Sequence, residues 1–316
     1  MENVIDYSNG ISAVDSGYGR PRLNAIHLMV EGDRAAIIDT AHNASLPRVR
    51  AALDAKAISA DRVEWVILTH VHLDHAGGAG AMMAQFPNAK LAVHPRGARH
   101  MIDPSRLMQG TVEVYGEARA RRLYGEIVPV DAKRVQEVSQ GATLRLGTRE
   151  LFFLETPGHA RHHVCIVDSK TGHLFAGDTL GLSYRELDDG PRQYVFPSSS
   201  PVQFDPGEFH RSLELMMSYR PEAVYVTHFG QVRDIGRLSA DLHRLIDALA
   251  AIGLRYRDAG GERRSLIRHA VEELVLEEAR LQNWRLDRDR ILEVLGADIE
   301  LNAMGLESWL EASSRG

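Results

Sequence analysis

The sequence of 316 residues has a single cysteine and no long hydrophobic run. The lone Cys165 excludes a disulfide framework within the chain and is typical of a protein from a reducing compartment. No apolar stretch approaches the length of a transmembrane helix, and residues 1–6 lack the basic and apolar regions of a secretory signal. We therefore expect a cytoplasmic protein with no membrane partner.

Long runs of basic residues are also missing, and the net charge is −6 with histidine neutral. Because nucleic-acid binding usually requires a basic patch or stripe, we expect no nucleic-acid partner. Hydrophobic residues make up 44% of the chain, which is long enough to bury a large core, as in an ordinary globular protein. The expected partner is a small-molecule substrate, and a homodimer stays open.

From residue 20 to 235, short β-prone runs alternate with helical ones. The runs 25–30 and 35–39 are joined by Glu-Gly-Asp, which predicts a hairpin. Further strands are predicted at 65–69, 91–94, 143–146, 151–155, 163–167, 174–176 and 223–227, and helices at 46–58, 76–86, within 95–124 and at 209–217. Residues 182–206 predict a long loop, of the kind that carries function or forms a lid.

From Leu238 onward the strand signals vanish, and Leu242, Leu245 and Leu249 recur at helical spacing. We predict two parts: residues 1–235 as the main domain and residues 236–316 as a C-terminal helical extension. Packing or dimerisation is the favoured role of the extension. The alternative is that it walls a substrate pocket.

The most informative segment is residues 69–78, Thr-His-Val-His-Leu-Asp-His-Ala-Gly-Gly, which directly follows an apolar run. Residues two apart in an extended segment point to the same side, so His70 and His72 can grip one ion together. Asp74 and His75 follow as the chain turns into a helix, and they face a neighbouring position for a second ion. These ligand types at this spacing indicate a hydrolytic metal site rather than a histidine-rich surface turn.

Three more candidate ligands stand at strand ends or turns further along the chain. His159 follows a Pro-Gly turn that projects it from a rigid corner, Asp178 follows Phe-Ala-Gly, and His228 ends the last predicted strand. The run 65–70 also resembles the run 223–228, since both are β-prone and end in Thr-His. Ligands commonly gather at the carboxyl ends of strands, so we expect these side chains to converge.

Through these motifs, residues 20–235 resemble the metallo-β-lactamase superfamily. The resemblance implies an α+β fold, an αββα sandwich with a dinuclear metal site along one edge of the two sheets. Asp39, which ends the run 35–39, would buttress that site. Two divalent metal ions are expected, Zn2+ first, with iron or manganese as alternatives. The resemblance assigns the first ion to His70, His72 and His159, the second ion to Asp74, His75 and His228, and the bridging position to Asp178.

The ligand set implies a reaction. Two such ions share one water, lower its pKa toward neutrality and stabilise the oxyanion that forms when the resulting hydroxide attacks a carbonyl or phosphorus centre. Asp74 and Asp178 are the expected catalytic residues: Asp74 orients the nucleophile and passes a proton to the leaving group, and Asp178 bridges the ions. The expected enzyme is a metal-dependent hydrolase that cleaves an ester-like bond, a thioester or a lactone, of a small molecule.

Other branches of the superfamily match less well. Class B β-lactamases lack a bridging acid at the position of Asp178, and flavodiiron relatives place an acid where this chain has His72. Acyl-homoserine lactonases place a catalytic tyrosine where this chain has Gly181, and Tyr184 comes three residues later. What remains is a glyoxalase II-like, lactonase-like and thioesterase-like group. Two alternatives stay open: a persulfide dioxygenase-like oxidoreductase with one iron, and a non-catalytic metal-binding protein.

Overall fold

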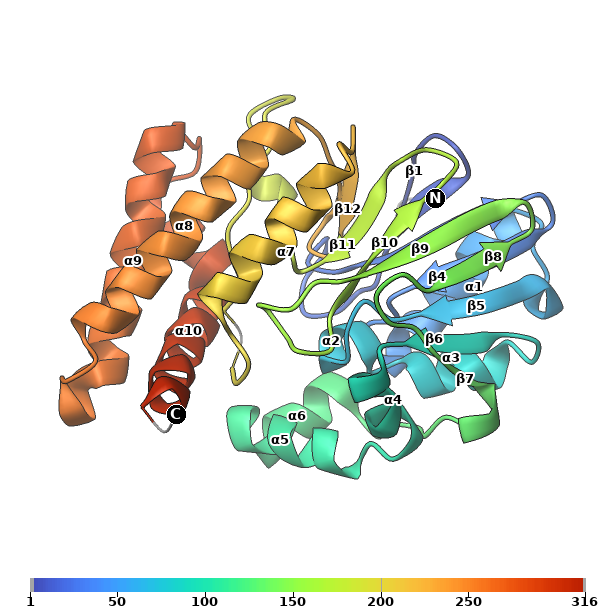
Figure 1. Ribbon diagram of the computed structural model, residues 1–316, viewed down its shortest axis with the longest axis horizontal. Coiled ribbons are helices and arrows are strands. Elements are labelled where there is room, and N and C mark those ends of the chain that lie inside the picture. The colour runs from blue at the N-terminus through green and yellow to red at the C-terminus, as the bar shows by residue number, and fades with distance from the viewer. Residues whose placement is uncertain (1–2, 200, 315–316) are drawn as a thin grey trace.

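Two β-sheets form the centre of the protein, which a computed structural model describes for residues 3–199 and 201–314 (Figure 1). The first sheet has seven strands in chain order, and the second has six in the order β13-β12-β11-β10-β9-β8. The strands of the first sheet are β1 (Val4–Asp6), β2 (Ile11–Asp15), β3 (Ala25–Glu31), β4 (Arg34–Ile38), β5 (Val63–Ile67), β6 (Lys90–Val93) and β7 (Val135–Glu137). Those of the second are β8 (Thr143–Leu146), β9 (Arg149–Glu155), β10 (Val164–Asp168), β11 (Leu174–Gly177), β12 (Val224–Val226) and β13 (Gly230–Val232).

Helices cover the outer face of each sheet. On the side of the first sheet lie α1 (Leu46–Ala55), α2 (Leu73–Ala76), α3 (Ala79–Gln85), α4 (Pro95–Ile102), α5 (Ser105–Tyr115) and α6 (Glu117–Tyr124). On the side of the second lie α7 (Pro206–Ser218), α8 (Ile235–Arg255), α9 (Arg263–Gln282) and α10 (Arg288–Ser313). The layers follow the order helix, sheet, sheet, helix, which confirms the predicted α+β fold and αββα sandwich.

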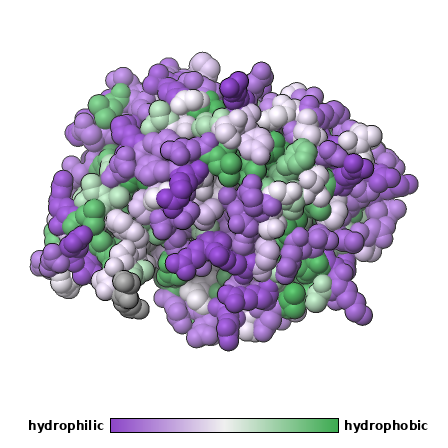
Figure 2. All heavy atoms as spheres, in the orientation of Figure 1, coloured by the Kyte–Doolittle hydropathy of each residue, from purple (hydrophilic) through white to green (hydrophobic). Residues whose placement is uncertain are grey.

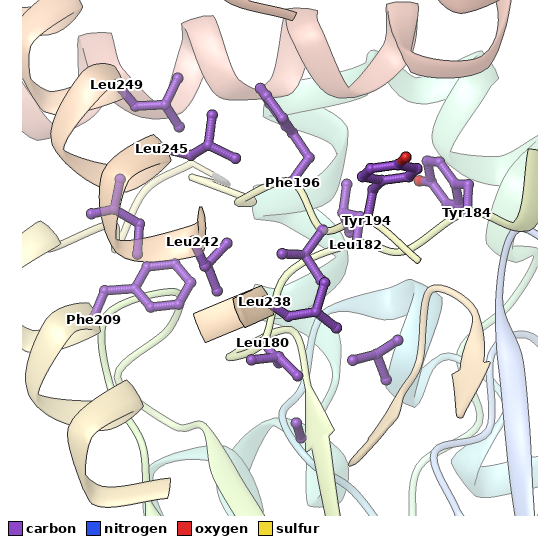
Figure 3. Packing of buried hydrophobic residues seen from close by; sticks show 14 of the residues in the cluster. Leu180, Leu182, Tyr184, Tyr194, Phe196, Phe209, Leu238, Leu242, Leu245 and Leu249 are labelled. Carbon is purple, nitrogen blue, oxygen red and sulfur yellow. The ribbon is translucent and has the colours of Figure 1, made fainter. Parts of the chain in front are cut away.

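The buried hydrophobic side chains form three large clusters that correspond to the three interfaces between layers. One cluster lies between the sheets and includes Ile38, Ile67 and Phe153. A second packs the helices α1, α3 and α4 on the first sheet. The third packs α7 to α10 on the second sheet, where leucines of α8 meet Phe196 and Phe209 (Figure 3). Because burial of apolar area dominates folding energetics, these contacts hold the helical layers to the sheets.

The C-terminal helices share this third cluster with the sheet. Leu238, Leu242, Leu245 and Leu249 of α8 are all fully buried, as their helical spacing predicts. In Figure 1 the helices α8, α9 and α10 (orange to red) stand together beside the second sheet. The helical character of the predicted extension, residues 236–316, is confirmed for residues 236–314, and the last two residues lie outside the described part of the chain. The separation of the extension as a second part stays a prediction.

Most predicted elements form within a few residues of their expected ends, with two informative differences. The predicted helix 76–86 is broken into α2 and α3, because the chain between them passes under the turn after β4. Gly78 N donates to the carbonyl of Ala41 at 2.9 Å, and a Cβ on Gly78 would lie 2.7 Å from the carbonyl oxygen of Thr40. The strands β1, β2, β7 and β13 were not predicted, since each is only three to five residues long.

The surface indicates no obvious docking face for a second copy. On the side drawn in Figure 2, hydrophobic residues lie in scattered groups on a mostly hydrophilic surface. Among the described residues, the exposed large hydrophobic side chains come from separate segments, such as Ile102, Val202 and Leu281. A homodimer therefore stays a prediction. No described helix is both long and apolar enough to cross a bilayer.

Candidate metal centre

The seven predicted ligands come together at one edge of the sandwich, where strands of both sheets end. His70 and His72 follow β5, and Asp74 and His75 lie in the short α2 directly after them. From the second sheet, His159 follows β9 through the Pro-Gly turn, Asp178 follows β11, and His228 follows β12. The two Thr-His runs that resemble each other in sequence therefore deliver one histidine from each sheet.

One group of possible ligand atoms consists of His70, His72 and His159. His70 Nε2 and His159 Nε2 lie 2.9 and 3.0 Å from Nδ1 of His72. The three rings meet nearly at right angles, with centroids 4.5 to 4.9 Å apart. This group has the membership that the resemblance assigned to the first ion.

A second group consists of Asp74, His75 and His228. Oδ2 of Asp74 lies 3.6 Å from His75 Nε2 and 3.4 Å from His228 Nε2. Asp178 stands between the two groups: its Oδ2 lies 3.4 Å from His159 Nε2, and its Oδ1 lies 3.3 Å from His75 Nε2. Asp178 thus turns one carboxylate oxygen toward each group, as a bridging ligand must.

Acceptors outside the cluster fix the orientation of four imidazole rings through their other nitrogen. Nδ1 of His159 donates to the carbonyl of Ser198 at 2.9 Å, and Nδ1 of His228 donates to the carbonyl of Leu23 at 2.9 Å. Nδ1 of His70 contacts the Thr69 hydroxyl at 3.2 Å. In the fourth ring, Nδ1 of His75 donates to a buried carboxylate, that of Asp39, at 2.8 Å. These partners set the tautomer in which Nε2 carries the free lone pair.

Asp39 is the hub of this outer layer. It is fully buried, with a backbone φ of +57°. Its carboxylate accepts from Thr69 N and from Thr227 Oγ1, each at 2.8 Å, as well as from His75. Because Thr69 follows a strand of the first sheet and Thr227 a strand of the second, Asp39 ties both sheets to one ligand. This contact pattern agrees with the buttressing role expected for it.

The buried acceptors of the cluster fit a metal site. His75 Nε2 and Asp178 Oδ1 are buried and have no hydrogen-bond partner among the described residues. Facing lone pairs within about 3 Å of one another are costly in a protein interior unless a cation or proton lies between them. Imidazole nitrogen and carboxylate oxygen are the donors that divalent transition metals prefer. The side chains present therefore fit one or more divalent ions, and the ligand role of each residue stays a prediction.

Burial and mutual charge set the ionisation of the cluster. Burial, reinforced by the neighbouring imidazoles, lowers the pKa of His72 to about 3 and that of His70 well below its usual range. Burial alone would raise the pKa of Asp178, but the imidazoles beside it outweigh burial and hold that pKa well below its usual range. The pKa of Asp74 is lowered against burial by the same kind of neighbours. Burial would lower the pKa values of His75 and His228, but the carboxylates beside them outweigh burial and raise both, that of His75 well above its usual range. Because neutral imidazoles and ionised carboxylates are the forms that bind metal, metal binding at these two rings would release protons.

Some residues that shape the centre were not assigned a role from sequence. The ring of His163 accepts from Asp178 N at 3.1 Å through Nε2, and its Nδ1 contacts Thr156 Oγ1 at 2.8 Å. His163 therefore positions the bridging carboxylate through its backbone. Tyr184 lies under the centre: its hydroxyl donates to Asp298 at 3.2 Å, and its ring stands edge-on to His228 at 6.3 Å.

A cavity of about 350 Å3 opens over the cluster. His72, Asp74, Asp178 and His228 line its floor, and α5, Ser198, residues 201–203 and α10 supply its walls. The helix α10 contributes Asp298 and Leu301, a contact between the C-terminal extension and the cavity that favours the alternative role for the extension. Burial raises the pKa of Asp298 to about 6.

The family model of the metallo-β-lactamase superfamily matches residues 19–228. The chain belongs to this superfamily. It is 27% identical to a metallo-β-lactamase fold-containing protein, ST1585, of Sulfurisphaera tokodaii, over 54% of this chain and 62% of that protein. It is also 31% identical to a hydroxyacylglutathione hydrolase of Xanthomonas euvesicatoria pv. vesicatoria, over 45% of this chain and 43% of that enzyme. These alignments span less than two thirds of either relative.

Solved structures of the superfamily share the whole fold. The crystal structure of ST1585 from Sulfolobus tokodaii superposes with a TM-score of 0.67, 22% identity, and coverage of 95% of this chain and 99% of that chain. A metallo-β-lactamase family protein of Thermus thermophilus, TTHA1429, gives a TM-score of 0.68 at 18% identity, over 96% of this chain and 94% of that chain. Since these matches extend over nearly all of this chain, they include the C-terminal helices. At such identities the likeness shows the fold alone.

Proposed function

We propose that this protein is a dinuclear metal-dependent hydrolase that cleaves an ester-like bond, a thioester or a lactone, of a small molecule. The observation that carries the proposal is the position of Asp178: one of its carboxylate oxygens faces His159 and the other faces His75, and a group of His70, His75 and Asp178 joins the two histidine groups beneath one cavity. The relatives named hydroxyacylglutathione hydrolase support hydrolysis as the class of reaction. Zinc is the first choice of metal for this mixture of imidazole and carboxylate donors.

We assign the predicted ligands two roles, metal binding and proton transfer. His70, His72 and His159 would hold one ion, Asp74, His75 and His228 the other, and Asp178 both. When bound, such ions supply Lewis acidity and a water that is acidic near neutral pH. Asp74 is ionised and its side chain is 24% exposed toward the cavity. Since Oδ2 of Asp74 faces the two histidines, Oδ1 is the atom that would take a proton and deliver it to the leaving group.

The cavity also favours a small organic substrate. Apolar side chains of Leu107, Val114, Leu182 and Leu301 lie above the polar floor, so an acyl chain can be desolvated while its carbonyl faces the ligands. Beside the cavity, the hydroxyl groups of Tyr18 and Tyr124 form a hydrogen bond of 2.7 Å, which restrains both side chains.

The first test is metal content per chain, measured by elemental analysis, followed by assays with thioester and lactone panels. Two zinc, iron or manganese ions per chain together with hydrolysis would support the proposal. One iron per chain with thiol-dependent oxygen uptake would favour the persulfide dioxygenase-like alternative. Full metal content without turnover of any substrate would favour a binding protein.

The variant Asp74→Asn tests the proton-transfer role. We expect kcat to fall by roughly 10²- to 10⁴-fold, because an amide cannot accept the proton. The matched control is Asp54→Asn, an exposed acid at the end of α1, which should keep full activity. Retained activity in Asp74→Asn, with the fold intact by circular dichroism, would contradict the assigned role.

A further inference from the structure

A second cavity, of about 360 Å3, adjoins the one above the ligand cluster. Three of its lining residues, His100, His162 and Gln203, also line the cavity above the ligand cluster, so the two spaces meet along these side chains. We call this second cavity the arginine pocket. Its lining residues are Arg96, Arg99, His100, Arg161, His162 and Gln203.

The three guanidinium groups of the arginine pocket have no carboxylate partner. Across residues 3–199 and 201–314, none of Arg96, Arg99 and Arg161 forms an ion pair, whereas most arginines elsewhere pair with an acid, as Arg145 does with Glu150. Nη1 of Arg96 donates to the carbonyl of Arg161 at 3.3 Å. All three side chains are exposed and line one cavity, so a multiply charged anion in that cavity would be attracted by three positive charges.

The other lining groups are also suited to an anion. The side-chain oxygen of Gln203 accepts from Arg161 N at 2.7 Å, so its amide nitrogen remains as a donor. Burial is the main cause of the lowered pKa of His100, and the charges of Arg99 and Arg106 add to it, against the charge of Asp103. No acidic residue lines this pocket among the described residues.

A single imidazole ring separates the arginine pocket from the candidate metal centre. The ring of His162 belongs to both cavities, and its centroid lies 5.7 Å from that of His72 and 6.1 Å from that of His70. Nδ1 of His162 accepts from Val71 N at 3.4 Å, which holds the ring in this place. A group bound by the arginines and a carbonyl bound over the ligands can therefore belong to one small molecule.

We propose that the arginine pocket binds a phosphate group of the substrate, so that the enzyme acts on small esters or thioesters that carry a phosphate a few bonds from the scissile carbonyl. This inference rests on the proposed function for its substrate class, but the phosphate site itself does not. Guanidinium forks match the oxygens of phosphate, and a phosphate monoester has a charge near −2 that suits three cations better than one carboxylate does.

Direct binding tests the site without catalysis. Metal-loaded wild-type protein, Arg99→Gln and Arg161→Gln would be titrated calorimetrically with inorganic pyrophosphate. The matched control is Arg122→Gln, which removes the same charge from an exposed position on α6 outside both cavities. We expect about tenfold weaker binding in each pocket variant, unchanged binding in the control, and partial recovery in Arg161→Lys. Equal affinity in all proteins would mean that pyrophosphate binds elsewhere, and would overturn the inference.

Activity tests the substrate class. Acetyl esters of ω-hydroxyalkyl phosphates with two to five methylenes would be compared with the matching esters that lack the phosphate. We expect kcat/KM to favour the phosphorylated ester at least tenfold at the best chain length, and this ratio to fall about tenfold in Arg99→Gln. Hydrolysis without a phosphate preference, or with an equal preference for a carboxylate-bearing ester, would overturn the inference and leave the proposed function intact. Pyrophosphate binding that depends on the arginines, without hydrolysis of any ester, would support the phosphate site and contradict the proposed function.

Discussion

A buried histidine outside the metal centre should make the stability of this protein fall in mild acid. His27 lies in β3, is 1% exposed, and packs against the rings of Phe175 and Tyr225 with centroids 5.6 Å away. Its Nε2 is buried and has no hydrogen-bond partner among the described residues. Burial lowers the pKa of His27 from 6.5 to about 4, with only partial compensation from the charge of Asp39.

The sign and size of the effect follow from linkage. Between pH 6.5 and 4 the unfolded chain binds a proton at His27 that the folded chain does not, so the stabilisation is complete above the unfolded pKa and is lost as the pH falls. With these two pKa values, lowering the pH from 8 to 5 costs about 2 kcal/mol of unfolding free energy, and lowering it to 4 costs about 3 kcal/mol.

The variant His27→Leu removes this titration and leaves the metal ligands unchanged. Urea unfolding at pH 8 and pH 5, followed by far-UV circular dichroism, gives the free energy of unfolding of both proteins. We expect the wild type to lose about 2 kcal/mol more than His27→Leu between the two pH values. Because both proteins share one ligand set, the pH dependence of metal binding cancels in this difference.

The control for this experiment is His269→Leu, at an exposed position on α9, which should follow the wild type at both pH values. A parallel loss of stability in wild type and His27→Leu would refute the reasoning. It would mean that the folded protein accommodates a protonated His27, for instance by letting water reach Nε2.

Other substitutions test the outer contacts and the core. Asp39→Asn should weaken metal binding about 10- to 100-fold in a chelator competition assay, because an amide cannot accept from Thr69, Thr227 and His75 together. Leu242→Ala, in the cluster between α8 and the second sheet, should cost about 2–5 kcal/mol in urea unfolding, whereas Leu281→Ala at a 61% exposed position should change it by less than about 0.5 kcal/mol. Removal of metal by a chelator should lower the Tm measured by calorimetry, since the buried acceptors then lose their shared cation; an unchanged Tm would argue against a buried metal site.

The sequence predicted the local part of the centre because that part is contiguous. His70, His72, Asp74 and His75 follow one strand within six residues, so strand and turn geometry alone places them near each other. His159, Asp178 and His228 come from other strands. Their places at strand ends and turns made them candidates, and the resemblance to a known family assigned each of them to an ion. The structure brings all of them within reach of the first four.

The substrate side of the site could not be predicted in the same way. Asp298 and Leu301 reach the cavity from α10, which starts more than 50 residues after the last predicted ligand. Helical periodicity predicts that one face of such a helix is buried, but it does not predict which part of the protein that face contacts. Arg119, Arg121 and Arg122 stand close together in the sequence, which favours a solvated helix face, and they lie on exposed α6. The arginines of the arginine pocket instead come from α4 and from the turn after His159. The position of an arginine in the sequence does not reveal whether the fold will place an acidic residue beside it.

The connections of Asp39 imply that assembly of the centre and closure of the sandwich are one event. Asp39 directly follows β4 of the first sheet. Its carboxylate accepts a hydrogen bond from Thr227, which follows β12 of the second sheet, and also orients the ring of His75. Separation of the sheets would break the contact with Thr227 and leave the buried carboxylate that orients His75 short of a donor. Of the cavity walls, Ser198 accepts from His159, whereas no residue of α5 bonds to Asp39 or to the ligand cluster among the described residues. We therefore expect changes in α5 to alter which substrate enters while the ligand cluster keeps its geometry.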